Sequence, residues 1–223
     1  YKRQIIGDDV AGIDNFFVAL ADHPNVQSVL AVGLGCETIQ SQELAAKLLA
    51  RNVSTQYRII QESGGVEGTV AAGVAAAQDL RAQYPERTVA LSSLTIGIEV
   101  GRTVAQLDEL EKLLKSEGCS VVTVRSEGSS AEAFSRLAEA KAHLIISFPD
   151  DNQPASGFPL IPVINVAGKG VLHQAIAGDF DCQEMNLLTE ILALMNKVVA
   201  GSQTIAEKNR SGEIRAPRVV RSV

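Results

Sequence analysis

The feature that most constrains the fold is an alternation of short β-branched runs with longer runs rich in Ala, Leu and Glu. The first kind has the length of strands, and the second has the length and periodicity of helices. Strands that alternate with helices predict βαβ units and an α/β fold, with Rossmann-like layers in which helices cover both faces of a parallel sheet. The expected strands are Val26–Gly33, Thr55–Gln61, Val89–Ile98, Ser120–Arg125, His143–Phe148 and Ile161–Val166. The expected helices are Asp14–Ala21, Thr38–Arg51, Val66–Gln83, Val104–Ser116, Ala131–Ala140 and Cys182–Ala200.

The chain also matches itself when it is shifted by about 64 positions, which indicates an internal duplication. Gly33 then falls on Gly97, and Gly64 falls on Gly128. The match runs without a gap through strand, helix, strand and turn, so each half is expected to be one βαβ unit. Cys36 and Val100 should then lie at equivalent strand ends.

These patterns predict how the chain is organised. Residues 1–142 are expected to form a duplicated α/β region with halves at about 26–84 and 88–140. Residues 143–223 should add two strands in a βαβ-like extension, a long closing helix and a tail, packed on the same sheet. Gly201 is a plausible C-cap for that helix. The polar tail from Glu207 onward is expected to be an extended arm or a mobile end.

The composition narrows the class of protein. The chain has 223 residues, of which 46% are apolar, and a net charge of −6. An acidic chain without a basic run argues against nucleic acid or an anionic membrane as the main partner. No apolar stretch approaches the roughly 20 residues of a membrane span. The three cysteines lie far apart and do not suggest a disulfide framework, so a reduced, cytoplasmic protein is expected.

The first candidate site lies where the first two strands end. Cys36 and Glu37 follow the first strand, and Gln61, Gly64 and Gly65 follow the second. Ligands of open α/β sheets bind outside the carboxyl ends of strands. Cys36 and Glu37 are therefore candidate metal ligands, with Glu37 also a candidate catalytic base, and Gln61 and the glycines are candidate contacts for a substrate carboxylate. The alternative is an ordinary strand-to-helix turn with a small buried thiol.

Further candidates lie in the second half of the chain. Arg102 can bind a carboxylate through two hydrogen bonds, or can be a solvated residue of the first helical turn. Asn165 is a candidate substrate contact, Lys169 can neutralise an acid, and His173 is the one histidine considered as a base. The alternative for these residues is an ordinary loop before the last helix, with Asp181 as the N-cap of that helix.

Several motifs resemble the altronate/galactarate dehydratase family. They are "HPNVQSVLAVGLGCETIQ", "RIIQESGG", and the later run "PLIPVINVAGKG" followed by "DFDC". Members of that family carry a GLGCE strand end and an IQ.EGG strand end at similar spacing. The resemblance implies a cytoplasmic, metal-binding lyase of carbohydrate acid metabolism. Such a hydro-lyase converts an aldonic, aldaric or related hydroxy acid to a 2-keto-3-deoxy acid, usually with a divalent metal, here iron or manganese.

The chain also departs from that family. The family has a Cys-Gly-Gly-Ser-Asp motif where this chain reads "TIGIEVGRTVAQ", so that Val100 replaces the cysteine. A long middle segment and an upstream His/Gly/Cys segment are also missing. These differences predict a shortened or degenerate relative, whose activity is uncertain. The alternative function is a non-catalytic module that binds small acids, or a subunit that needs a partner chain. A homo-oligomer, or a separate small substrate-binding domain, is the expected partner.

Overall fold

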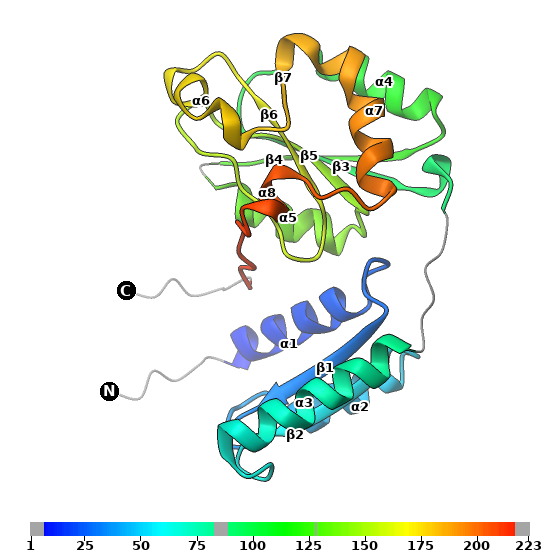
Figure 1. Cartoon of the computed structure of the whole chain (residues 1–223), viewed down its shortest axis with the longest axis vertical. Coiled ribbons are helices and arrows are strands. Elements are labelled where there is room, and N and C mark those ends of the chain that lie inside the picture. Colours follow the sequence, from blue (N-terminus) through cyan, green and yellow to red (C-terminus); the bar gives the residue numbers. More distant parts are fainter. Residues whose placement is uncertain (1–6, 83–88, 128, 217–223) are drawn as a thin grey trace. The chain divides into compact units, whose positions relative to one another are not determined.

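The computed structural model describes residues 7–82, 89–127 and 129–216. The chain divides into two compact units (Figure 1). Unit 1 comprises residues 1–87 with 216–223, and unit 2 comprises residues 88–215. Each unit is described separately below. Among the described residues, no helix combines the length and the apolar character that a membrane crossing requires.

Unit 1 is built around one parallel pair of strands. Strands β1 and β2 are joined by the crossover helix α2, and Ser28 pairs with Ser54 at the start of the ladder. The elements are α1 (Gly7–Ala21), β1 (Ser28–Gly33), α2 (Ser41–Leu49), β2 (Ser54–Ile59) and α3 (Gly65–Ala82). A parallel pair needs such a long connection, because its two strands run in the same direction. The predicted first βαβ unit is therefore present.

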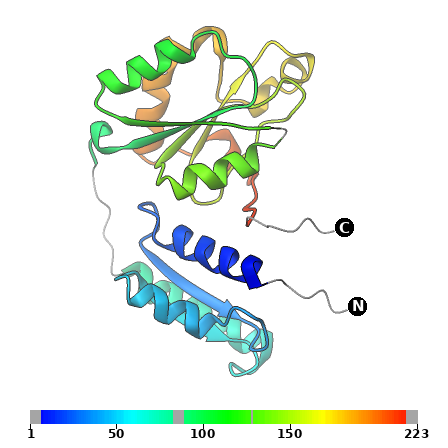
Figure 2. The same ribbon diagram turned by 180° about the vertical axis from the view of Figure 1, so that it is seen from behind.

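Helices cover both faces of this small sheet. Val29 of β1 packs in one apolar cluster with Val18 of α1 and Leu48 of α2. The next residue, Leu30, points to the opposite face, because side chains alternate along a strand. There it lies against α3, where a Cβ added at Gly73 would be 3.6 Å from a Leu30 methyl group. Figures 1 and 2, seen from opposite sides, show α3 and α2 in turn in front of the strands.

Unit 2 contains a five-stranded parallel sheet in the order β4-β3-β5-β6-β7. Its strands are β3 (Thr95–Val100), β4 (Ser120–Arg125), β5 (Leu144–Phe148), β6 (Val163–Ala167) and β7 (Cys182–Gln183). Its helices are η1 (Leu91–Ser93), α4 (Leu107–Ser116), α5 (Ser130–Glu139), α6 (Val171–Ala175), η2 (Ala177–Asp179), η3 (Glu184–Asn186), α7 (Leu187–Val199) and α8 (Ile205–Lys208). The chain reverses direction across the sheet between β3 and β5, which is a topological switch point. The expected α/β class, with parallel strands between helices, is confirmed.

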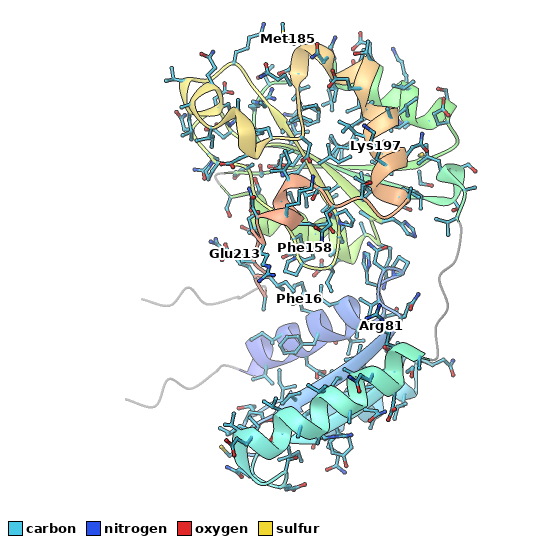
Figure 3. All side chains as sticks on the ribbon, viewed as in Figure 1. Phe16, Arg81, Phe158, Met185, Lys197 and Glu213 are labelled. Atoms are coloured by element: carbon cyan, nitrogen blue, oxygen red, sulfur yellow. The ribbon has the colours of Figure 1, made fainter. Side chains whose placement is uncertain are left out.

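The two faces of the second sheet are buried by different helices. Ile96, Ile98 and Val100 of β3 point to the face covered by α4 and α7, where they join Leu110 and Met195 in the main core. The intervening residue Gly97 points to the other face, which α5 covers. Figure 1 shows α4 and α7 on one side of the sheet and α5 and α8 on the other. Figure 3 labels Phe158 and Met185; Phe158 is buried against Phe134 of α5, whereas Met185 is exposed.

The two predicted βαβ units are present, but the ungapped register between them is wrong. Strands β3 and β4 pair in parallel around α4, as β1 and β2 do around α2. However, β3 begins 67 residues after β1, and β4 begins 66 residues after β2. The shift of 64 therefore pairs Gly33, the last residue of β1, with Gly97 in the middle of β3. Val100 ends β3, and Cys36 follows β1 by three residues. Gly128 lies outside the described residues.

The boundary between the units differs from the expected one. The two halves of the predicted duplicated region belong to different units, which divide between Arg87 and Thr88 rather than at residue 142. Strands β5, β6 and β7 continue the sheet of the second half only. Hydrophobic periodicity is a local property and cannot indicate which strands share a sheet. The alternation of strands and helices therefore favoured one continuous α/β region over residues 1–142.

The short elements β7 and α8 were not predicted. The expected final helix begins at Leu187 rather than at Cys182, because Cys182 starts the edge strand β7. Asp181 consequently does not cap that helix. Helix α8, which carries a capping box between Thr204 and Glu207, extends into the start of the expected polar arm. Gly201, with φ +97°, follows the C-cap of α7, so the helix ends where predicted. The tail beyond residue 216 lies outside the described residues.

The packing at Gly97 makes a testable prediction for unit 2. A Cβ added there would lie 3.1 Å from a Leu137 methyl carbon and from the Ala142 Cβ. Gly97→Ala should therefore lower the free energy of unfolding by about 1–3 kcal/mol, measured by urea denaturation. Gly178→Ala is the control, because nothing lies within 4 Å of its added Cβ, and it should change stability by less than about 0.5 kcal/mol. Equal effects would contradict the described packing.

Candidate functional site

The loop after β1 and the loop after β2 lie side by side at the carboxyl edge of unit 1. The backbone N–H of Ile60 donates to the carbonyl of Gly33 at 2.9 Å, and that of Gln61 donates to the carbonyl of Leu34 at 3.3 Å. Gly35 has a φ of +114°, which favours glycine, and a Cβ there would also lie 2.9 Å from the Gln61 side-chain oxygen. Cys36, Glu37 and Gln61 are therefore brought to the same edge, as the sequence predicted.

The carboxylate of Glu37 turns back onto its own loop. Its Oε2 accepts a hydrogen bond of 2.6 Å from the Gly35 N–H, and its backbone carbonyl accepts one from the Gln40 side chain. Its Oε1 fills the space where a Cβ of Gly33 would stand, so a side chain at residue 33 would displace the carboxylate. That oxygen is buried and has no hydrogen-bond partner among the described residues.

Backbone N–H groups of the loop lower the pKa of this carboxylate, and the N–H of Gly35 donates to it directly. The N–H of Glu37 itself has the largest effect and that of Gly35 the next, while Cys36 and Leu34 contribute less. Partial burial opposes them, because it disfavours the charged form. Successive N–H groups that converge on one point form a nest, which is an anion-binding arrangement of the backbone. In this structure the nest holds the chain's own carboxylate.

The glycines after β2 are open to solvent. Gly64 and Gly65 have φ values of +78° and +81°, and no atom lies within 4 Å of a Cβ added at either position. Gly65 begins α3, where its N–H donates to the Ile60 carbonyl and its carbonyl accepts from Thr69. Gln61, Gly64 and Gly65 are all exposed. They occupy the predicted edge and leave it accessible to a small ligand.

Cys36 is exposed at this edge, whereas Cys119 and Cys182 are buried. The pKa of Cys119 is raised by burial and by Glu117. The pKa of Cys182 is raised to about 12, mainly by burial and further by Asp181 and Glu190. Cys36 does not point into a sealed core, and β1 and β2 are neighbours, so its role as a site residue stays a prediction. A cavity of about 280 Å³ beside the loop is lined by Thr38, Ile39 and Lys47 among others, and not by Cys36.

The residues at this edge do not form a complete metal site. The described residues contain no group of three or more His, Cys, Asp or Glu side chains placed to hold a metal ion. Cys36 and Glu37 would supply two donors, whereas protein metal sites usually draw on three or four. The Glu37 carboxylate is moreover engaged by Gly35. Binding of iron or manganese by Cys36 and Glu37 stays a prediction that needs further donors.

Arg102 lies at the carboxyl edge of unit 2, but it is already paired. Its buried guanidinium forms an ion pair with Glu184 and donates to the Val166 carbonyl at 3.2 Å. Its Nε lies 3.7 Å from Asp151 Oδ1, and it stands over the Phe148 ring. Arg102 thus ties the loop after β3 to β5, β6 and η3. Arg102 is therefore not the solvated residue of a helical turn that was one of its expected roles. Its guanidinium is also not free to bind a substrate carboxylate.

The other predicted residues of unit 2 have different surroundings. His173 is completely buried: its Nδ1 accepts from the Gly168 N–H at 2.8 Å, so Nε2 carries the proton and faces the carbonyls of Asp150 and Gln153. Both ring nitrogens are therefore occupied. Asn165 is buried within β6 and bonds the Ser156 backbone through both side-chain atoms. Lys169 is exposed in the loop after β6.

A group around Glu99 was missed by the sequence analysis. Glu99 is completely buried, and its carboxylate accepts hydrogen bonds from Ser126, from Ser130 at 3.2 Å and from Ser147 at 2.8 Å. The three serines come from the loop after β4, the start of α5 and β5. Each has the appearance of an ordinary turn or strand residue, so only the register of the sheet, which pairs Glu99 with Ser147, identifies the group.

Comparison with known protein families supports the predicted family resemblance for unit 1. Residues 2–84 match the family model described as D-galactarate dehydratase/Altronate hydrolase, second domain. The predicted family resemblance is confirmed for this segment. The match spans less than half of the chain and includes the loops after β1 and β2. No curated protein and no solved structure matches the chain.

The cysteine environments predict the reactivity of the thiols. In the native protein one thiol, Cys36, should react rapidly with Ellman's reagent, because the other two are buried. All three should react after denaturation in guanidinium. Cys36→Ser should abolish the rapid phase and leave the slow reaction of the buried thiols unchanged. A rapid phase that persists in this variant would contradict the assignment.

The lowered pKa of Glu37 predicts a contribution to acid sensitivity. A carboxyl group with a lower pKa in the folded state stabilises that state above its ordinary value of 4.5, and the stabilisation is lost as the pH falls through the folded value. Glu37→Gln should therefore be less stable than the wild type at pH 7 and lose less stability on acidification. Urea midpoints of the wild type and the variant, measured at pH 7 and at a pH below the folded-state pKa of Glu37, give the difference in stability. An unchanged pH dependence would contradict the role of the nest.

Proposed function

We propose that the chain takes part in the dehydration of a small hydroxylated sugar acid, with its site at the carboxyl edge of unit 1. The family match over residues 2–84 supports the chemical class, since the family is described by a dehydratase of D-galactarate. The site is proposed there because the matched segment contains the adjoining loops of Cys36 and Gln61. Aldonic and aldaric acids are the proposed substrates.

The observation that carries this proposal is the Glu37 carboxylate held in the backbone nest. A sugar acid presents the same chemical group, so its carboxylate can replace that of Glu37 on the N–H groups of the loop. The exposed Gln61 amide and the open backbone at Gly64 and Gly65 are then available to the hydroxyl groups. Glu37 is in this sense an internal substitute for the substrate carboxylate.

Displacement from the nest would also change Glu37 chemically. Within the nest its lowered pKa makes it a weak base. Once released, it loses the N–H groups that stabilise its charge, and its pKa rises toward the ordinary value. Removal of the proton next to the substrate carboxylate needs a base at that place. Substrate binding would thus supply the base. If a divalent metal were bound, Cys36 with Glu37 would instead be among the residues holding it, and the metal would stabilise charge on the acid.

A second candidate function is a module that binds small acids, or a subunit that needs a partner chain. The incomplete donor set at Cys36 and Glu37 favours it, because within the described residues no third ligand joins them. Arg102, His173 and Asn165 are also engaged in contacts within unit 2. A second copy of the chain, or a separate small substrate-binding domain, would then supply the missing groups.

The two candidates are separated by measuring binding and turnover on the same protein. Binding of aldonic and aldaric acids is followed by calorimetry, and turnover by a 2-keto-acid assay with ferrous iron or manganese. We expect saturable binding and weak or no turnover by the isolated chain. Robust turnover by this chain alone would favour a complete hydro-lyase and contradict the subunit. Absence of binding would contradict both.

Glu37→Gln tests the role of the nest. The neutral amide is a weaker competitor for the N–H groups, so acid binding should tighten several-fold. Any turnover should fall by about 10²-fold or more, because the base is lost. Glu62→Gln is the matched control, since Glu62 is an exposed carboxylate beside Gln61. Weaker binding in the Glu37 variant would contradict displacement.

A further inference from the structure

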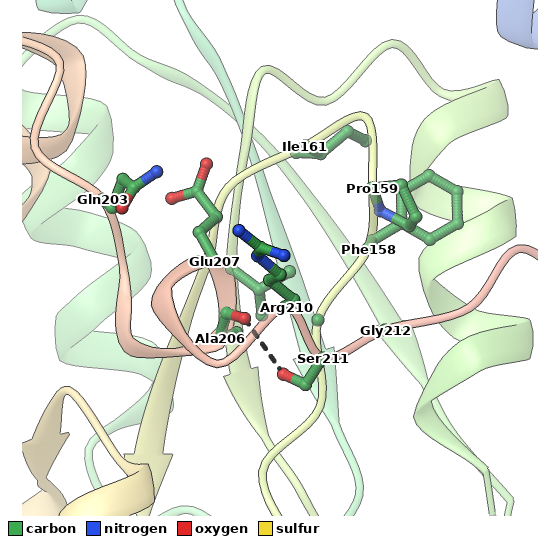
Figure 4. A pocket seen from close by; sticks show the side chains of 11 residues that line it. Phe158, Pro159, Ile161, Gln203, Ala206, Glu207, Arg210, Ser211 and Gly212 are labelled. Atoms are coloured by element: carbon green, nitrogen blue, oxygen red, sulfur yellow. Dashed lines mark hydrogen bonds between the residues drawn. The ribbon is translucent and has the colours of Figure 1, made fainter.

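A cavity of about 370 Å³ lies in unit 2 beside the amino-terminal end of β6. Its walls come from the loop between β5 and β6 and from α8 with the residues after it. Figure 4 shows Phe158 and Pro159 on one side and Gln203, Glu207 and Arg210 on the other. Its volume is in the range of pockets that hold small metabolites. None of the residues predicted from the sequence as site residues lines it.

The walls of this cavity are fixed by backbone contacts. Gly212, with φ +129°, approaches the Gly157 carbonyl so closely that neither glycine can carry a side chain without displacing the other segment. The hydroxyl of Ser211 donates to the Ala206 carbonyl at 3.2 Å (Figure 4). Phe158 is held edge-on against Phe134 of α5, with ring centroids 6.4 Å apart. These contacts hold the two walls of the cavity in place.

Arg210 is the cationic group of the cavity. It has a φ of +51° at the end of α8, where its N–H donates to the Glu207 carbonyl and the Ser211 N–H donates to the Ala206 carbonyl. This is a Schellman motif, whose left-handed position favours glycine. Within the described part of the chain, no side-chain hydrogen bond or ion pair engages the Arg210 guanidinium. Lys141 has the same conformation after α5, so the conformation alone assigns no role to Arg210.

Glu207 supplies the opposite charge. Its Oε2 accepts the Thr204 N–H at 2.8 Å and completes the capping box of α8. The Glu207 side chain is exposed, and within the described residues no hydrogen bond or ion pair engages its Oε1. Phe158, Ile161 and Val163 give the cavity a buried apolar wall. The cavity thus combines one cation, one anion and an apolar surface.

We propose that this cavity binds a free α-amino acid with an apolar side chain. The Arg210 guanidinium binds the carboxylate, the Glu207 carboxylate binds the ammonium group, and the side chain packs against Phe158 and Pro159. A simple carboxylate would leave Glu207 facing a like charge, and a sugar acid would place hydroxyl groups against the apolar wall. The site is independent of the proposed dehydration, since all its residues belong to unit 2 and to neither strand end of unit 1.

The experiment uses the full chain and three probes in calorimetry: L-leucine, 4-methylpentanoate and 3-methylbutylamine. The second probe lacks the ammonium group and the third lacks the carboxylate. We expect one saturable site for leucine and at least tenfold weaker binding of the other two. Absence of saturable leucine binding up to about 10 mM would overturn the proposal. Equal binding of leucine and 4-methylpentanoate would overturn the proposed contact between Glu207 and the ammonium group.

The variants Arg210→Gly and Glu207→Gln test the two charged groups of the cavity and are expected to fold normally. Arg210→Gly should abolish leucine binding and keep or raise the thermal stability, because glycine suits the left-handed position. Lys141→Gly is its matched control at the equivalent place after α5 and should leave binding unchanged. Glu207→Gln keeps the capping box but removes the charge, so it should weaken leucine and not 4-methylpentanoate. Retained leucine binding in Arg210→Gly would place the ligand elsewhere and overturn the proposal.

Discussion

Unit 2 is organised around the completely buried carboxylate of Glu99. A buried carboxylate without partners costs several kcal/mol, so the chain around it must deliver hydrogen-bond donors. Three serine hydroxyls do so, and they come from the loop after β4, from the first turn of α5 and from β5. The central strand β3 thereby fixes the entry of α5 and the register of β5. A sheet of purely apolar strands would have no comparable link between these segments.

The polar contacts continue along the sheet to the helix that forms the cavity. Ser147, which bonds Glu99, pairs in register with Asn165 of β6. The Asn165 N–H donates to Asp181, and the other oxygen of Asp181 accepts the N–H of Ile205 at the start of α8. Burial raises the pKa of Asp181, and these two hydrogen bonds oppose that effect. The position of α8, and with it the cavity beside Arg210, therefore depends on polar groups buried in the middle of the sheet.

The sequence predicted most elements but not how they are distributed between sheets. Strand β4 was predicted with its observed bounds, because its β-branched run follows the turn at Gly118 directly. The edge strand β7 has two residues and α8 has four, too few to show a period. At the first site, Glu37 and Gln61 were predicted together, since the ends of neighbouring parallel strands meet at one edge. The serines around Glu99 escaped prediction because their grouping depends on register and not on spacing.

The two βαβ units differ at the carboxyl ends of their first strands: the edge is accessible in unit 1 and closed in unit 2. In unit 1 the loop after the strand is rich in glycine, its N–H groups hold a carboxylate from the same loop, and the adjoining residues are exposed. In unit 2 the corresponding edge is closed, because Glu99 is enclosed by serines and Arg102 is paired with Glu184. A carboxylate on a short local loop can be displaced by a ligand at low cost, whereas removal of Glu184 would take the shortest ion pair from the buried Arg102 guanidinium. Exchange with a substrate acid is therefore feasible at the end of β1 and unfavourable at the end of β3.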